Sequence, residues 1–523
     1  MQEKNIFDMN NIPQEKFEFT NSNDRLHDKK LETKQMSYFE DVLRRFAKNK
    51  SSVVAAFIIA ILVLFALIGP FTVNQAYVDS FASQTILNRY QYLTPRLGIF
   101  EGTGFWDGTK VVEDVSEVRY NTYLAMEQEL GRPIIQKVID TKTITDPFGK
   151  TKTTYTLRID TYTSLDCFVR TLTTKEYQDI QAWQDATGIQ VLLPMVDTNK
   201  SGNELNKNIW FVSDKKGNPK LDKDGNFQYA YLKTDGRDDY TSTVRLEDDP
   251  YTEENPSAGW RYANRGGSAD LGYNYTVRIN AYNYFIYMYD FEPSFVFGTN
   301  VRGFDIFSRL ASGARFSFIL AVVVSVINLL IGAIYGAIEG YYGGVVDMVM
   351  ERISDIIGGI PFTVVTVLFS LHLSSKIGMV PSLLFAFVFT GWLGMAARVR
   401  MQFYRFKNQE YVLAARTLGA SDFRIMFKHI FPNSMGTIIT GSILVIPSVI
   451  FSETSLSYLG IINLSSAQMT SIGAMLSEGQ NCMTSAPHVV LFPALFIALL
   501  MISFNLFGNG LRDAFNPSTR GVD

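Results

Sequence analysis

Six stretches of about twenty residues carry no Asp, Glu, Lys or Arg, and they constrain the fold of this chain more than any other feature. A helix of about 20 apolar residues crosses the hydrocarbon core of a bilayer. A buried helix of a soluble protein rarely stays uncharged for so long, so six such runs predict six membrane-spanning helices. The uncharged windows are residues 51–73, 316–338, 356–375, 377–397, 430–452 and 489–511.

The Lys and Arg residues that flank these windows predict the orientation of the chain. Basic residues crowd the entry to the first window, from Arg44 to Lys50, and they recur through residues 398–428. The segment 460–488 contains no Lys or Arg. Because loops rich in Lys and Arg stay in the cytoplasm, we expect both termini and the loop 398–429 to be cytoplasmic. The protein is then a multi-pass protein of the cell membrane.

Successive spans cross the membrane in opposite directions, so residues 74–295, between the first and second spans, are expected to lie outside the cell. Their composition differs from that of the spans. Alternating apolar and polar residues predict strands, and a run from Thr174 to Thr187 predicts a short helix. About 220 residues suffice for an independent core, so we predict an α+β extracellular domain. The predicted strands are residues 152–160, 191–195, 227–232 and 275–280.

One turn in this segment resembles the opening of a calcium-binding loop. Asp222, Asp224 and Asn226 have the spacing of the first ligands, with Gly225 between them. The glycine falls one position early and the later glutamate is missing, so a plain hairpin turn is the favoured interpretation.

The two cysteines, Cys167 and Cys482, both fall in segments predicted to face the oxidising side. A disulfide between them would clamp the extracellular domain onto the outer ends of the spans. Two unpaired thiols are the favoured alternative, because nothing in the sequence brings the two residues together.

The sequence lacks the features of an enzyme or a nucleic-acid-binding protein. The formal net charge is −3, and no basic surface for nucleic acid is indicated. No Gly-x-x-x-x-Gly-Lys-Ser/Thr loop, which would hold nucleotide phosphates, occurs in the chain. The four histidines are too far apart to form a metal motif. We therefore predict no catalytic residue, no metal and no cofactor in this chain.

The loop 398–429 contains two predicted helices joined by a sharp turn. Residues 410–418 favour a helix, and Gly419 is suited to a left-handed C-cap. Ser421 or Asp422 is suited to cap a second helix, which Pro432 would end at the membrane. Such a basic, rigid hairpin fits a groove on a soluble partner. An amphipathic helix lying on the membrane surface explains the same residues equally well.

Several motifs resemble those of ABC importer permeases. Ala414, Ala415 and Gly419, followed by Pro432, are similar to the EAA loop of that family, although Leu413 replaces its usual glutamate. Other motifs resemble the second permease of oligopeptide and dipeptide importers. They are FGTNVRGFDIFSR at 297–309, GARFS at 313–317, GYYGGVVD at 340–347, HIFPN at 429–433, ETSLSYLG at 453–460 and NLFGNGLRDAFNP at 505–517.

The resemblance implies a helical membrane protein with six transmembrane helices of the ABC importer permease type and an inserted α+β extracellular domain. It divides the chain into a partly flexible cytoplasmic segment (1–50), the first span (51–73), the extracellular domain (74–295) and a permease core (296–523). By the same resemblance, the residues that couple the chain to an ATPase are Glu410, Tyr411, Ala414, Ala415, Arg416, Leu418, Gly419, Ala420, Ser421 and Asp422.

The function implied by the resemblance is one half of the translocation path of an ATP-driven importer of oligopeptides. The expected partners are a second permease, two ATPase subunits that bind ATP and Mg, an extracellular substrate-binding protein and membrane lipid. Importers of dipeptides, nickel chelates or other small solutes share these motifs. A membrane-anchored receptor, in which the extracellular domain is the functional part, is the alternative from another class. A secondary transporter would tend to show an internal repeat, and none is evident.

Overall fold

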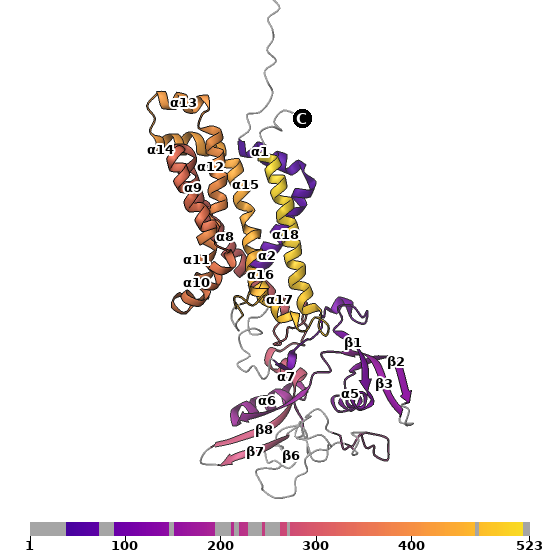
Figure 1. Cartoon of the computed structure of the whole chain (residues 1–523). Helices are drawn as coiled ribbons and strands as arrows, with labels where there is room; N and C mark the ends of the chain where they lie inside the picture. The colour runs from indigo at the N-terminus through magenta and orange to yellow at the C-terminus, as the bar shows by residue number, and fades with distance from the viewer. Residues whose placement is uncertain are drawn as a thin grey trace, which may run out of the picture.

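A computed structural model of the chain contains a helical bundle and an α+β region at one end of it (Figure 1). The structure describes residues 38–72, 88–145, 151–193, 211–213, 219–228, 243–245, 262–268, 272–465 and 470–515.

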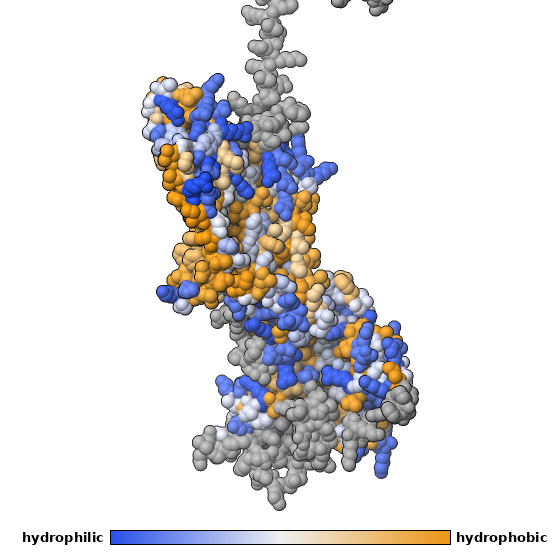
Figure 2. Space-filling model, viewed as in Figure 1, coloured by the Kyte–Doolittle hydropathy of each residue, from blue (hydrophilic) through white to orange (hydrophobic). Residues whose placement is uncertain are grey.

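Five long apolar helices are able to cross a membrane by length and composition. Their outward side chains are apolar: Ile319 on α8 is 57% exposed and Leu330 is 58% exposed. Figure 2 shows hydrophobic residues over much of the bundle on the face in view. Lipid, rather than water, suits such a surface. The five candidate spans are Lys50–Phe71, Ile306–Tyr342, Met379–Phe406, Asp422–Tyr458 and His488–Phe515.

The predicted third span is not a single helix. Residues 356–375 cover the end of α9 (Gly344–Gly358) and most of α10 (Phe362–Ile377), and the two helices meet at an angle of 70°. Pro361 lies at the break; it lacks an N–H and disfavours a helical residue before it. The bundle therefore contains five spans, or six if this bent pair counts as one.

The remaining helices of the bundle connect or extend these spans. The helix α1 packs beside the end of α18, and α17 precedes α18 at the opposite end (Figure 1). The bounds are α1 Tyr38–Lys48, α2 Lys50–Thr72, α8 Ile306–Tyr342, α11 Met379–Gly391, α12 Leu393–Phe406, α13 Glu410–Thr417, α14 Asp422–Arg424, η7 Ile425–Ile430, α15 Phe431–Ile443, α16 Val445–Tyr458, α17 Ile472–Gln480 and α18 His488–Phe515.

Close packing of α8 against α12 depends on glycine. A methyl group added at Gly332 would lie 2.7 Å from Met395 Cβ, and one added at Gly340 would lie 2.7 Å from the Arg400 carbonyl oxygen. Small residues spaced along one face allow two helix backbones to approach each other within a membrane. This contact fixes the position of Arg400 relative to α8.

The α+β region contains two antiparallel sheets. The first has the order β1-β3-β2, and α5 packs on it. The second has the order β4-β8-β7-β6, and β5 also pairs with β8. The bounds are β1 Thr109–Ser116, α5 Glu117–Leu130, β2 Ile135–Thr145, β3 Thr151–Asp160, β4 Cys167–Thr173, α6 Thr174–Thr187, β5 Leu192–Leu193, β6 Thr243–Arg245, β7 Tyr262–Ser268, β8 Gly272–Asn280 and α7 Ala281–Tyr289, with short 3₁₀ turns η2 Asn88–Tyr90 and η3 Gly98–Phe100.

Most predicted elements of this region are confirmed. The predicted helix 174–187 is α6, which begins at a capping box formed by Thr173 and Glu176. The strands 152–160 and 275–280 lie in β3 and β8. Residues 222–226 form a turn, in which the Asp222 carboxylate accepts backbone N–H groups of Asp224 and Asn226. Residues 194–195 and 229–232 of the other two predicted strands lie outside the described residues.

Aromatic contacts attach the α+β region to the bundle. The ring of Phe297 stacks on Phe492 of α18 with 4.2 Å between centroids, and Trp106 lies 5.6 Å from Phe492. The Lys110 ammonium donates to the Ser485 carbonyl oxygen at 2.6 Å. The region is thus held against α17 and the start of α18, at the end of the bundle opposite α13 (Figure 1).

Candidate functional site

A short helix and a sharp turn lie at the end of the bundle that is far from the α+β region. The helix α13 is followed by Gly419, whose φ is +80°. Ser421 then caps the next helix, because its Oγ accepts the Arg424 N–H at 3.4 Å. The left-handed glycine and the Ser421 cap are both confirmed. A residue with a Cβ rarely adopts this backbone conformation, so glycine determines the turn.

The prediction that Pro432 ends the second helix is wrong. The chain stays helical from Asp422 to Tyr458, through the π-helical turn Ile425–Ile430. Pro432 follows the π-helical turn directly, and the altered hydrogen bonding there accommodates its missing N–H within the continuous helix. The turn after α13 is therefore connected directly to a helix that crosses the membrane.

Buried and polar contacts hold this turn in place. Val412 and Ile425 are fully buried beneath it. The Tyr341 hydroxyl at the end of α8 donates to Asp422 Oδ1 at 2.6 Å, and Arg416 Nη2 donates to the Tyr341 oxygen at 3.4 Å. The turn is thus fixed to α8 as well as to its own helix.

The turn and the helix before it expose several large apolar side chains. Leu418 is 87% exposed and Phe423 is 69% exposed, and Leu413 and Tyr411 are also exposed. We call these four exposed apolar side chains together the apolar ridge. An exposed apolar patch on an anchored polar loop is typical of an interaction surface.

The structure places the ten predicted coupling residues in one short segment, mostly at the surface. Ala415 is buried and Ala420 is half-buried, and the other eight are exposed. The predicted set omitted Leu413 and Phe423, which belong to the ridge, and Tyr341, which anchors it. Leu413 and Phe423 are apolar residues in a basic loop, and that contrast was the available signal.

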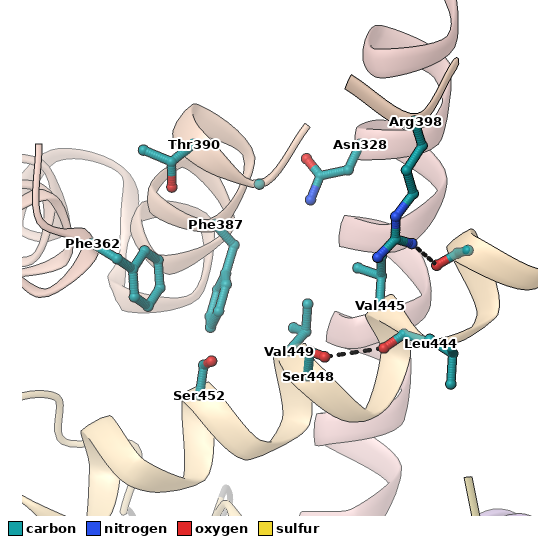
Figure 3. Close-up of a pocket in the computed structure, with 12 residues that line it drawn as sticks. Asn328, Phe362, Phe387, Thr390, Arg398, Leu444, Val445, Ser448, Val449 and Ser452 are labelled. Carbon is teal, nitrogen blue, oxygen red and sulfur yellow. Dashed lines mark hydrogen bonds between the residues drawn. The ribbon is translucent and has the colours of Figure 1, made fainter. Parts of the chain in front are cut away.

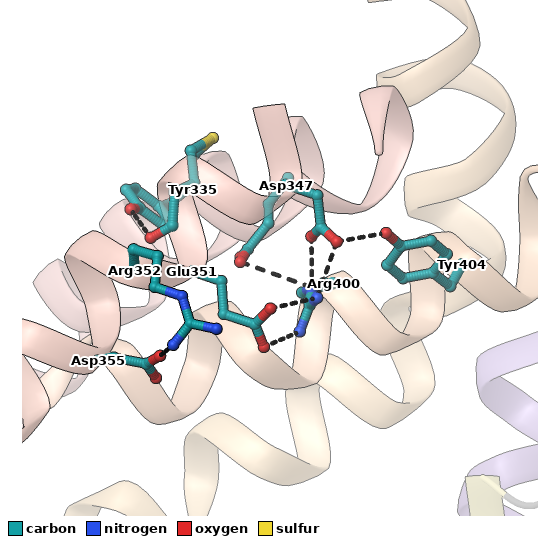
Figure 4. A network of polar contacts seen from close by, with 9 residues as sticks. Tyr335, Asp347, Glu351, Arg352, Asp355, Arg400 and Tyr404 are labelled. Atoms are coloured by element: carbon teal, nitrogen blue, oxygen red, sulfur yellow. Dashed lines mark hydrogen bonds and ion pairs between the residues drawn. The ribbon is translucent and has the colours of Figure 1, made fainter. Parts of the chain in front are cut away.

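A polar network lies beneath the turn and joins α8, α9 and α12 (Figure 4). Arg400 makes two hydrogen bonds to Asp347, at 2.6 and 2.8 Å, and two to Glu351, at 2.8 and 3.1 Å. Its Nε also lies 3.5 Å from Glu339, and Tyr404 donates to Asp347 at 2.7 Å. Paired hydrogen bonds from one guanidinium fix orientation as well as distance.

The two cysteines are both free and buried. Arg278 and Asn280 of β8 contact the Cys167 sulfur at 3.9 Å. Cys482 donates to the Gly479 carbonyl oxygen at 3.2 Å. Both residues are free thiols in the structure.

Comparison with known proteins identifies the bundle. Residues 329–521 match the model of the binding-protein-dependent transport system inner membrane component. Residues 37–95 match the N-terminal TM domain of oligopeptide transport permease C. The oligopeptide transport system permease protein OppC of Bacillus subtilis (strain 168) is 44% identical over 43% of this chain and 72% of the relative.

The chain belongs to the OppC/DppC family of ABC importer permeases. The dipeptide permease DppC of the same organism is 42% identical over 43% of this chain and 69% of its own length. OppC of Escherichia coli (strain K12) is 38% identical over 44% of this chain and 75% of its own length.

Family membership makes this permease a non-catalytic subunit without a cofactor of its own, in an ABC transporter complex with ATPase subunits. Membership in this family excludes the two alternative predictions, a membrane-anchored receptor and a secondary transporter. The two family models leave residues 96–328 unmatched. The α+β region lies within that interval, so it is an insert between two parts of the permease.

Proposed function

We propose that this permease forms half of the translocation path for oligopeptides and is coupled to separate ATPase subunits through the α13 turn. The observation that carries the proposal is the apolar ridge on an anchored turn at the end of the bundle. Leu418 and Phe423 remain 87% and 69% exposed in the described chain, although each would be more stable out of water.

The ridge has the properties of a surface that docks on a protein. The same segment also exposes the basic residues Arg416, Arg424 and Lys428. Interfaces commonly combine an apolar centre with a polar rim. A groove with apolar walls and acidic edges on an ATPase subunit would complement it.

Movement of the docked ATPase would reach the membrane through one continuous helix. The turn leads into residues 422–458, and Tyr341 ties the same turn to α8. A pull on the turn would therefore tilt α14–α16 and α8 together. Rigid-body tilting of helices is a common means of alternating between two states.

The proposed orientation places the turn, both termini and the ridge in the cytoplasm and residues 74–295 outside. The start of α2, the turn and the end of α18 lie at one end of the bundle, and the α+β region lies at the other (Figure 1). Arg44, Arg45 and Lys48 lie at the same end as the turn, as expected for the cytoplasmic side.

The proposed partners are a second permease, two ATPase subunits and an extracellular substrate-binding protein. Six spans at most are few for a large solute path, so a second permease would complete it. Oligopeptide is the proposed substrate; the relatives include both oligopeptide and dipeptide permeases at similar identity. Uptake of labelled tripeptides to pentapeptides, in competition with dipeptides, distinguishes the two.

The docking role is tested with Leu418→Asp and Phe423→Asp in the purified complex. We expect each variant to reduce both co-purification of the ATPase subunits and peptide-dependent ATP hydrolysis. Leu221→Asp is the matched control, because Leu221 is an exposed apolar residue of the α+β region. Wild-type subunit recovery and transport in both ridge variants would refute the proposal.

A further inference from the structure

A cavity of about 330 Å³ lies within the bundle, between α8, α10–α12, α15 and α16 (Figure 3). Phe362 and Phe387 lie across the cavity from Asn328 and Arg398. Its lining combines five apolar side chains with the polar side chains of Asn328, Thr390, Arg398, Ser448 and Ser452. Small-molecule sites of this size likewise combine apolar walls with polar groups that orient the ligand.

Arg398 is a cationic side chain in the membrane-spanning helix pair α11–α12. From the sequence alone it counted only as a basic residue that marks the cytoplasmic side. In the structure its Nη1 donates to the Gly441 carbonyl oxygen at 3.1 Å, and it lines the cavity. Among the described residues, the ion pairs of α12 with the carboxylates of α8 and α9 are made by Arg400 and not by Arg398. Charged groups within a membrane are costly and usually face a substrate path or a partner charge.

Asn328 on α8 is a second polar group at the same cavity. Its side chain is 2% exposed, and its Oδ1 has no hydrogen-bond partner among the described residues. A buried amide oxygen without a donor costs on the order of 1–3 kcal/mol. An N–H group of a bound molecule would remove that cost.

Two glycines leave room for these polar side chains. A methyl group at Gly441 would lie 2.7 Å from Arg398 Nη1, and one at Gly391 would overlap the Asn328 amide. A larger residue at either glycine would therefore collide with the Arg398 or the Asn328 side chain.

We infer that Arg398 binds the C-terminal carboxylate of a peptide in transit, while Asn328 accepts a backbone N–H of the same peptide. This inference rests on the proposed function and adds two substrate-binding residues to it. A guanidinium supplies paired donors to a carboxylate, and an amide oxygen accepts from a peptide N–H. Both ligand groups occur together at the C-terminal end of every unmodified peptide. A carboxylate side chain of the second permease has the same chemistry, and the experiment distinguishes the two sources.

The test compares trialanine with trialanine amide in the reconstituted complex, with wild-type protein and with Arg398→Gln and Asn328→Leu. We expect Arg398→Gln to lower transport of trialanine roughly tenfold or more, as for loss of a charge-assisted hydrogen bond. Transport of the amide should change less than about twofold. Asn328→Leu should lower transport of both peptides, because both retain the N–H groups.

A second measurement does not depend on delivery by the binding protein. Ser448→Cys places a thiol in the cavity, and its labelling by a maleimide is followed in membranes at millimolar peptide concentration. Trialanine should slow the labelling more than its amide does, and Arg398→Gln should abolish that difference.

The outcomes separate the two proposals. Equal losses for the acid and the amide in Arg398→Gln, with no acid-specific protection in Ser448→Cys, would show that Arg398 pairs with the second permease, and would overturn the inference. A wild-type complex that transports no peptide of any length would contradict the proposed function itself.

Discussion

Tyr341 at the end of α8 donates a hydrogen bond to the carboxylate of Asp422, with 2.6 Å between Oη and Oδ1. These two residues are 81 positions apart in the chain. The bond joins a membrane-spanning helix to the turn that carries the apolar ridge. Replacing Tyr341 by Phe removes only the hydroxyl, so it tests this connection directly.

For Tyr341→Phe we expect loss of about 1.5–3 kcal/mol of local stability, as for a hydrogen bond to a charged group. Amide exchange of residues 410–422 should become faster, and peptide transported per ATP hydrolysed should fall. Tyr342→Phe is the control, because the neighbouring Tyr342 side chain is 52% exposed. Identical exchange in the two variants would contradict a role for this bond.

Gly419→Val should disrupt the turn. The φ of +80° is unfavourable for a residue with a Cβ, by roughly 1–2 kcal/mol and more when the side chain is branched. A Cβ there meets no atom within 4 Å, so the effect comes from backbone strain and not from a clash. We expect less ATPase bound to the purified permease. Gly419→Asn should retain more binding, since Asn tolerates this conformation, and an equal loss in both variants would argue against strain as the cause.

Arg400→Gln should destabilise the bundle near the turn. The variant leaves Asp347 and Glu351 without their guanidinium, and we expect a loss on the order of 2 kcal/mol in this half-buried setting. Thermal unfolding in lipid nanodiscs measures it. The matched control is Arg352→Gln, whose ion pair with Asp355 is exposed and should contribute less than about 1 kcal/mol. Equal melting temperatures for the two variants would contradict the importance of the network.

The Cys167 thiol should be unreactive until the α+β region unfolds. Burial raises its pKa to about 11 from an ordinary value of 9.0. Because the native pKa is the higher one, the contribution of this thiol to stability is present below pH 9 and is lost as the pH rises through about 11. Iodoacetamide at pH 8.5 should leave Cys167 unlabelled in native membranes and label it fully in detergent that unfolds the protein.

Lys152→Cys supplies the exposed control for that experiment, because residue 152 lies on the surface of β3. Labelling of Cys167 as fast as that of the control would contradict its burial. Recovery of a peptide that links Cys167 to Cys482 would restore the disulfide alternative.

Features that depend on a local run of residues were predictable. The apolar windows identified the membrane spans, since the transfer of a helix into lipid depends mainly on its own side chains. The capping box of Thr173 and Glu176 begins α6 where expected, and Gly419 takes the left-handed conformation that its place after a helix predicted. Each of these outcomes rests on interactions within a few residues.

Local sequence patterns gave wrong predictions where the geometry of the surrounding helix decided the structure. Pro432 has the sequence character of a helix end, but a π-helical turn before it lets the helix continue. The apolar window 356–375 has the composition of one span, but the chain bends by 70° within it. The mean hydropathy of a window depends only on its composition, so it is the same for a straight helix and for a bent pair of helices.

The sequence by itself determined that the chain enters lipid, where its apolar helices lie along the chain, and that one basic loop makes a sharp turn. Only the tertiary structure decided that Arg400 meets Asp347, 53 residues away, and that Arg398 faces a cavity beside Asn328. The reason is physical: the free energy of inserting a helix into lipid is a sum over the residues of that helix. A contact between two helices depends instead on where their backbones cross, which here is set by glycines such as Gly332 and Gly340.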